Sequence, residues 1–201
     1  VALDMDGAEP DYRRALELSP NDVDALQNLS VDLASRGKPE LAVAQVQRAI
    51  AIDPLYGRAY LLLARYQSGL GLFDDARQTI LKAIALEHSS GIFDAVLTTV
   101  EVQRGDAPAA QAAADRALPG LWQEFAQAMA RQIGGNHAAA DAALQVLIDH
   151  QSQNMGYQIA EVYALRRDAD QTFAWLDRAL ANRDPGLQFM PVDPFLLRFR
   201  D

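Results

Sequence analysis

The chain has 201 residues, of which 50% are hydrophobic, and a formal net charge of −9. This negative charge argues against a broad surface for nucleic acid or for an anionic membrane. The sequence contains no cysteine, which excludes disulfides, zinc–thiolate sites and thiol catalysis and fits a reducing compartment. No apolar run approaches the roughly 20 residues that a membrane-spanning helix needs, so we expect a cytoplasmic protein without membrane contact.

The first twenty residues form an incomplete unit. Residues 8–18 predict one helix, which Ser19 and Pro20 then end. This helix corresponds to the second helix of each later unit. Residues 1–20 are therefore expected to be a partial N-terminal repeat, and the chain to be either a piece of a longer protein or a protein with a trimmed N-terminus.

A repeat of fixed length begins at Asn21. Residues 21–54 and 55–88 are two 34-residue segments that align without a gap. A fixed period of this length indicates a repeat architecture. The matched pairs are Gly37 with Gly71, Ala42 with Ala76, and Ala49 with Ala83.

Each period predicts a pair of helices. Leu26, Leu29 and Leu33 recur at i, i+3 and i+7, which marks one face of a first helix. Gly37 then ends that helix, because glycine readily adopts the left-handed conformation of a helix end. A second helix follows with a stripe of small residues that lets the two helices approach closely.

At these residues the chain resembles the tetratricopeptide repeat (TPR) family. The resemblance implies an all-α, right-handed superhelical solenoid of antiparallel helix pairs. The sequence departs from the family at Gln67, where an aromatic residue is usual, and at His88, where proline is usual. The residues that carry the resemblance are Leu26, Leu29, Ser30, Leu33, Gly37, Ala42, Ala49 and Pro54 in the first segment, and Tyr60, Leu63, Ala64, Gly71, Ala76 and Ala83 in the second.

Three further helix pairs are expected after the second segment. The spacing shortens after Ala117, which predicts a local change in superhelix geometry near residues 118–121. In the last pair Arg167 takes the place of the turn glycine. The complete set of five predicted pairs is 21–54, 55–88, 89–118, 119–152 and 153–182.

The remaining residues, 183–201, are apolar for a chain end and are expected to be a capping tail. We predict an extended strap and a short helix from Pro194 that cover the last exposed repeat face, as such arrays require. The C-terminal part also resembles the TPR regions of bacterial multidomain regulators, which implies a module of a larger regulatory or signalling protein. This second resemblance rests on Ala160, Tyr163, Trp175, Leu176, Ala179, Arg183, Asp184, Gly186, Leu187, Val192, Asp193, Pro194, Leu197 and Arg198.

The sequence shows no convincing catalytic constellation, so we expect no enzyme activity, no cofactor and no metal site. His137 and Asp141 have the i, i+4 spacing of two metal ligands. Because no further ligand accompanies them, a solvated surface pair is the expected arrangement.

The remaining route to function is a concave groove lined by the first helices, where a peptide or partner domain would bind. Arg58 and Arg65 offer planar donors for a carboxylate, although both could instead be solvated or pair with acidic side chains on adjacent helices. The candidate groove residues are Gln27, Asn28, Val31, Arg58, Leu61, Arg65, Ser68 and Thr99.

Two alternatives stay open. The apolar tail could make the chain a self-association module that forms a homodimer. A pocket near Trp122, Phe125 and Met129 could instead hold a small ligand and make the chain a sensor or an enzyme.

Overall fold

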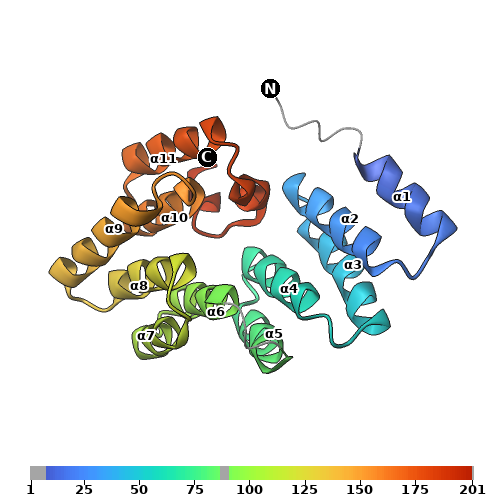
Figure 1. The fold of residues 1–201 in the computed structure, drawn as a ribbon, viewed down its shortest axis with the longest axis horizontal. Coiled ribbons are helices and arrows are strands. Elements are labelled where there is room, and N and C mark those ends of the chain that lie inside the picture. Colours follow the sequence, from blue (N-terminus) through green and yellow to red (C-terminus); the bar gives the residue numbers. More distant parts are fainter. Residues whose placement is uncertain (1–7, 87–90, 201) are drawn as a thin grey trace. The chain divides into compact units, whose positions relative to one another are not determined.

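The computed structural model describes residues 8–86 and 91–200, and all regular secondary structure in these ranges is helical (Figure 1). The chain divides into two units. Unit 1 comprises Val1–Leu86 and Gln188–Pro194, and unit 2 comprises Glu87–Leu187 and Phe195–Asp201. The predicted boundary between the second and third pairs, at residue 88, lies outside the described ranges. None of the helices found in these ranges is long and apolar enough to cross a lipid bilayer.

Unit 1 contains one single helix and two helix pairs. Within each pair the two helices lie side by side and run in opposite directions (Figure 1). The apolar core of this unit is built around Leu26, Leu29, Leu33 and Tyr66, all at most 2% exposed. The helices are α1 (Ala8–Leu18), α2 (Val23–Ser35), α3 (Pro39–Ile52), α4 (Gly57–Gly69) and α5 (Phe73–Leu86).

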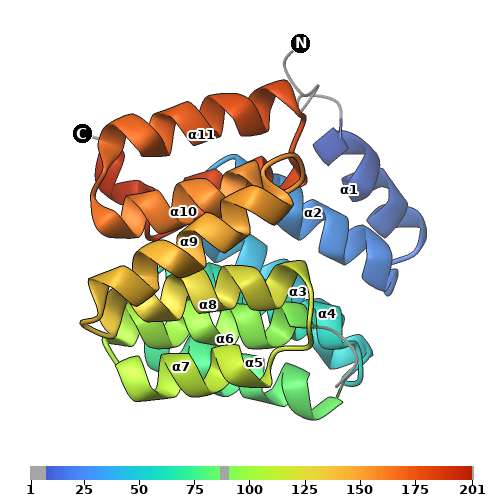
Figure 2. The same cartoon turned by 60° about the vertical axis from the view of Figure 1, so that its left-hand side comes forward.

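Unit 2 continues the alternation of first and second helices. Figure 2 shows α10 and α11 side by side, and the core of this unit includes Phe125, Met129, Tyr157 and Trp175. The helices are α6 (Gly91–Arg104), α7 (Ala107–Arg116), α8 (Leu121–Ile133), α9 (His137–Gln151), α10 (Gly156–Arg166) and α11 (Ala169–Ala181), followed by the 3₁₀ helices η1 (Pro185–Val192) and η2 (Leu197–Phe199).

Four of the five described corners between paired helices share one geometry. At each of these four, the backbone N–H of the residue after the positive-φ residue donates to a carbonyl five residues earlier, at 2.8 Å for Leu72 to Gln67 and 3.1 Å for Asp168 to Tyr163. This bond belongs to the glycine-type helix end, which needs a residue with positive φ. The corner residues are Gly37 (70°), Gly71 (76°), Gly105 (74°) and Arg167 (63°). Gly37 and Gly71 therefore occupy equivalent corners, as the 34-residue period predicts.

Small residues lie where paired helices approach most closely. A larger side chain at such a buried position would have to displace the facing helix, which costs about 1–3 kcal/mol in packed cores. Thr172 replaces the usual alanine and satisfies its hydroxyl by donating to the Asp168 carbonyl at 2.6 Å. The fully buried members of this set are Ser30, Ala42, Ala49, Ala64, Ala76, Ala83, Thr98, Ala110, Ala126, Ala160, Thr172 and Ala179, all 0% exposed.

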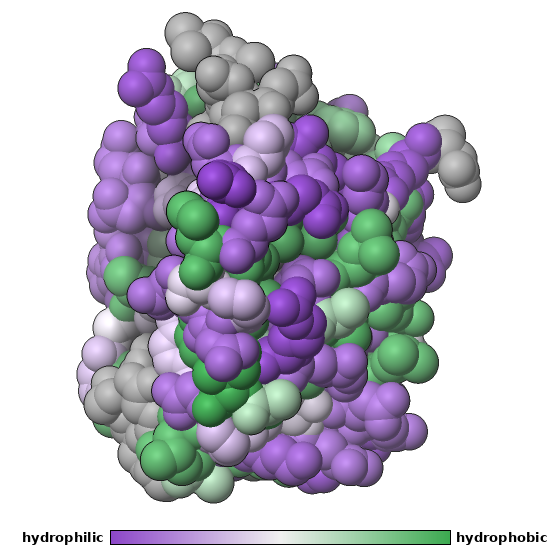
Figure 3. Space-filling model, turned by 90° about the vertical axis from the view of Figure 1, so that its right-hand side faces the viewer, coloured by the Kyte–Doolittle hydropathy of each residue, from purple (hydrophilic) through white to green (hydrophobic). Residues whose placement is uncertain are grey.

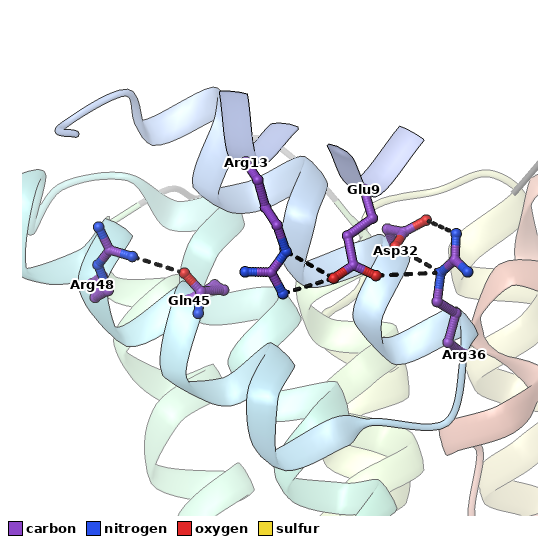
Figure 4. A network of polar contacts seen from close by, with 6 residues as sticks. All are labelled: Glu9, Arg13, Asp32, Arg36, Gln45 and Arg48. Atoms are coloured by element: carbon purple, nitrogen blue, oxygen red, sulfur yellow. Dashed lines mark hydrogen bonds and ion pairs between the residues drawn. The ribbon is translucent and has the colours of Figure 1, made fainter. Parts of the chain in front are cut away.

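The incomplete first unit is held by both apolar and charged contacts. Tyr12 and Leu16 of α1 pack against the core of unit 1. Figure 4 shows Glu9 accepting two hydrogen bonds from Arg13 of the same helix, at 2.8 and 2.6 Å, and also pairing with Arg36 at the end of α2, at 3.9 Å. The Arg13 hydrogen bond is the main cause that lowers the pKa of Glu9.

The C-terminal tail differs from the prediction in two respects. Its first part is the 3₁₀ helix η1 rather than an extended strap, and only the residues on either side of its middle part belong to the unit of the last repeat. Phe195 and Leu196 are buried in the core of unit 2, and Arg198 donates to the Ala164 carbonyl at 3.3 Å. Residues 188–194, by contrast, belong to unit 1. The expectation that the whole tail covers the last repeat is therefore wrong.

Candidate partner-binding site

One side of α4 carries most of the predicted binding residues of unit 1. Arg58, Leu61, Arg65, Ser68 and Gly69 follow the i, i+3, i+4 spacing that places side chains on one helix face. We call these five residues the α4 face. Arg58 is exposed, Arg65 is half-buried, and Leu61 and Ser68 are buried.

The α4 face is in contact with a segment of the same chain, residues 188–194, here called the tail segment. The guanidinium of Arg65 lies over the ring of Phe189, 4.8 Å from the ring centre. One turn further along α4, the backbone of Val192 approaches Gly69 so closely that a Cβ on Gly69 would collide with the Val192 carbonyl oxygen. That Cβ would also lie 3.1 Å from the Val192 carbonyl carbon and 3.2 Å from its Cβ.

The two contacts match in spacing and direction. Residues three apart eclipse in a 3₁₀ helix with a rise of about 2 Å per residue, so Phe189 and Val192 project from one edge about 6 Å apart. Arg65 and Gly69 are four residues apart on an α-helix, which is also about 6 Å. The tail segment thus runs in the same direction as α4 and in register with it.

Polar atoms of α4 stay without partners at this surface. Among the described protein atoms, Arg65 Nε and Ser68 Oγ of the α4 face are buried and have no hydrogen-bond partner. Buried donors and acceptors are nearly always paired, since an unpaired group loses its bonds to water without replacement. The tail segment therefore covers the α4 face without satisfying its hydrogen-bonding groups.

The predicted residues on α2 lie in different environments. Gln27 is buried and accepts a hydrogen bond from the Tyr56 hydroxyl, Val31 is half-buried against the core, and Asn28 is exposed. Burial, followed by the charge of Asp24, raises the pKa of Tyr56. Gln27, Leu61 and Ser68 are thus buried rather than open to solvent, and their role in binding stays a prediction.

A buried tyrosine supports α4 from the core side. Tyr66 is 0% exposed, and its hydroxyl oxygen lies 3.3 Å from Ser30 Oγ on α2. Burial raises the pKa of Tyr66 to about 12, because the phenolate would lose its hydration. This pair joins the first helices of two successive repeats.

Thr99, the predicted binding residue of unit 2, is half-buried on α6 and donates to the Val96 carbonyl at 2.8 Å. Its hydroxyl therefore already has a local backbone partner. Thr99 belongs to unit 2, whereas the tail segment belongs to unit 1.

The residues that sequence reasoning missed are Gly69, Phe189 and Val192. Gly69 falls outside the repeat pattern, because the aligned position in the first segment is Ser35. The apolar character of the tail indicates burial, but it does not indicate which helix receives the tail. A glycine one turn after an arginine on the same face is the signal that could have directed attention to α4.

The residues of the predicted apolar pocket pack within unit 2. Phe125 and Met129 are buried in its core, and Trp122 packs edge-on to Phe125 with ring centres 6.5 Å apart. These side chains serve packing in this structure, and the sensor alternative stays a prediction. An open hollow of about 470 Å³ does lie on α8 and α9, lined by Gln123, Glu124, Gln127, Arg131, Ala139, Ala142, Ala143 and Val146.

Asp141, one of the two residues with metal-ligand spacing, forms a salt bridge instead. Asp141 pairs with Arg166 at 2.8 Å, and the described residues contain no group of three or more side chains that could hold a metal ion. His150, on the same helix, contacts Glu124 at 2.8 Å, and this hydrogen bond raises its pKa.

The self-association alternative rests on the apolar tail, which is partly buried in the structure. On the face drawn in Figure 3, hydrophobic residues form scattered spots between hydrophilic ones. Phe195, Leu196 and Val192 of the tail are buried within the chain. A homodimer through this tail stays a prediction.

Comparisons with known proteins agree with the predicted repeat. A family model described as tetratricopeptide repeat matches residues 57–88. A peroxisomal targeting signal receptor of Kluyveromyces lactis is 28% identical over 81 residues, which are 40% of this chain and 14% of that protein. The small glutamine-rich tetratricopeptide repeat-containing protein 2 of Mycosarcoma maydis is 26% identical over 122 residues, which are 57% of this chain and 35% of that protein. The chain thus spans well under half the length of both relatives.

Solved structures show the same fold. PilW, a type IV pilus biogenesis factor, superposes with a TM-score of 0.66 over 98% of this chain and 91% of PilW at 15% identity. YrrB, a TPR protein, gives a TM-score of 0.54 over 88% of this chain and 95% of YrrB at 20% identity. Residues 57–88 therefore match the tetratricopeptide repeat, and the described part of the chain has the fold of tetratricopeptide-repeat proteins.

Proposed function

We propose that this chain is a non-catalytic protein-interaction module that binds a short segment of a partner protein on the α4 face. The observation that carries the proposal is the tail segment itself. A seven-residue stretch, Gln188–Pro194, lies on α4 in register, with an aromatic ring under Arg65 and a backbone carbonyl against Gly69. A surface that accepts one such stretch has the shape to accept another.

The comparisons support the same class of function. One relative is named as a receptor for a peroxisomal targeting signal, and YrrB is described as having an unusual peptide-binding site. Tetratricopeptide-repeat proteins are generally scaffolds without catalytic activity. The resemblance of residues 160–198 to bacterial regulators further supports a place within a larger cytoplasmic regulatory protein.

The proposal is tested by peptide display against the intact chain, followed by calorimetry with the selected peptides. Arg65→Ala removes the guanidinium that would stack on a ligand's ring, and we expect about a 3- to 10-fold loss of affinity, the range of a partly desolvated cation–π contact. The matched control is Arg178→Ala, which removes a similar guanidinium–ring contact, 4.4 Å from the Trp175 ring centre, on α11. Selected peptides that bind both variants equally well would contradict the proposal.

A further inference from the structure

The tail segment leaves some hydrogen-bonding groups of the α4 face without partners. The Nε of Arg65 and the hydroxyl of Ser68 are buried without hydrogen-bond partners among the described atoms, and Ser68 is only 6% exposed. Arg58, seven residues before Arg65, is exposed and makes no hydrogen bond or ion pair within the described ranges. A partner with suitable acceptors would therefore gain contacts that the tail segment does not make.

We propose that the tail segment is an internal ligand that competes for the α4 face with an external partner segment, and that this partner carries an acidic residue, an aromatic residue and a β-branched residue in that order. The inference rests on the proposed function and specifies the ligand and its regulation. The aromatic and β-branched residues are three apart, as Phe189 and Val192 are, and take their places over Arg65 and Gly69.

The position of the acidic residue in the partner segment follows from the spacing of Arg58 and Arg65 along α4. Arg58 lies seven residues before Arg65, about 10.5 Å along the helix axis. A bound segment that runs in the direction of the tail segment covers this distance in about three residues if extended and about five if 3₁₀. The carboxylate therefore lies three to five positions before the aromatic residue. The chain's own Asp184 has this spacing, but it accepts hydrogen bonds from the backbone N–H groups of Tyr157 (3.1 Å) and Gly186 (2.8 Å) instead.

Competition by a tethered segment has a measurable consequence. A tethered ligand acts at an effective concentration on the order of millimolar, so it lowers the apparent affinity of an external ligand by the fraction of time it occupies the site. Weakening the tail segment without changing α4 should therefore strengthen external binding. Phe189→Ala does this, because it removes the ring from Arg65 and leaves every residue of the α4 face intact.

A substitution at Gly69 should have the opposite effect on external binding to that of Phe189→Ala. Gly69→Ala places a methyl group against the Val192 backbone, which no side-chain rotation can relieve, while alanine suits the end of an α-helix. It should exclude both the tail segment and any external segment in the same register. Gly134→Ala is the matched control, because a Cβ there meets only ordinary contacts at 3.7 and 4.0 Å.

The test is fluorescence anisotropy with an acetylated, labelled peptide of residues 185–195 and the same peptide with Pro185→Glu. Both should bind the Phe189→Ala chain about tenfold more tightly than the intact chain or Gly134→Ala, and neither should bind Phe189→Ala combined with Gly69→Ala. The Pro185→Glu peptide should bind about threefold more tightly than its parent at low salt, and Arg58→Ala should abolish that difference.

Each outcome decides the proposal. Equal affinity of the peptides for the intact and Phe189→Ala chains, or binding that survives Gly69→Ala, would overturn the internal-ligand inference. If display-selected peptides bind in an Arg65-dependent manner while the tail peptides do not bind, the inference fails and the proposed function stands. If neither kind of peptide binds, both fail. An acidic peptide that gains nothing from Arg58 would overturn the assigned acidic position.

Discussion

The two units use the C-terminal tail in different ways. In unit 2 the residues after Pro194 are part of the core: Phe195 and Leu196 are 3% and 5% exposed, and Phe199 packs edge-on to Phe173. In unit 1 the tail segment is held by a ring on a guanidinium, by a close backbone approach and by Val192, which is 3% exposed in the core of that unit, with neighbouring polar atoms unpaired. We infer that the end of the tail is a structural cap, while the tail segment is an exchangeable occupant.

The largest expected effect is on the free energy of unfolding, and it distinguishes the end of the tail from the tail segment. Phe195→Ala should lower the free energy of unfolding by about 3–5 kcal/mol, because it removes a buried ring from a packed core. Phe189→Ala should cost only about 1 kcal/mol, since its ring is half-buried and stacks on a cation. Circular dichroism during urea unfolding follows the helices of both units, so it registers the destabilisation that either variant causes. Comparable losses for the two variants would contradict the distinction.

A second prediction concerns the corners. Gly71 in unit 1 and Arg167 in unit 2 adopt the same left-handed conformation, with φ of 76° and 63°. A side chain costs about 1 kcal/mol there relative to glycine. Gly71→Ala should therefore destabilise the protein by about 1 kcal/mol, and Arg167→Gly should stabilise it by up to about the same amount. Thermal unfolding of the two variants measures both changes, and destabilisation by Arg167→Gly would show that its side chain has a role beyond the turn.

The prediction with the smallest effect on stability at neutral pH concerns Tyr66 in the core of unit 1. Because burial raises the pKa of Tyr66 to about 12, folding favours its protonated form. The resulting stability is fully present below the unfolded pKa of about 10 and is lost as the pH rises from about 10 to 12. The loss can reach about 3 kcal/mol at about 1.4 kcal/mol per pKa unit. Tyr66→Phe should reduce this alkaline loss in urea unfolding between pH 9 and 12, and an unchanged pH profile would contradict the assignment.

The sequence predicted the parts of the fold that repeat. The 34-residue period located the glycine corners at Gly37 and Gly71 and the buried small residues of the paired helices, because these features have the same physical cause in every unit. It also directed attention to Arg65, which lies over the ring of Phe189 in the structure. It could not predict the placement of the tail segment, since Phe189 and Arg65 are distant in sequence and follow no common period. Nor does any repeat residue indicate where the chain divides into two units.

Amide hydrogen exchange of the tail segment in the Gly69→Ala chain is the most direct test of whether this segment is an exchangeable occupant of α4. Exchange measured by mass spectrometry should become faster in peptides that cover residues 188–194 and stay unchanged over α10 and η2, with no change anywhere in the Gly134→Ala control. Unchanged protection of residues 188–194, or faster exchange that extends through the core of unit 2, would contradict the claim.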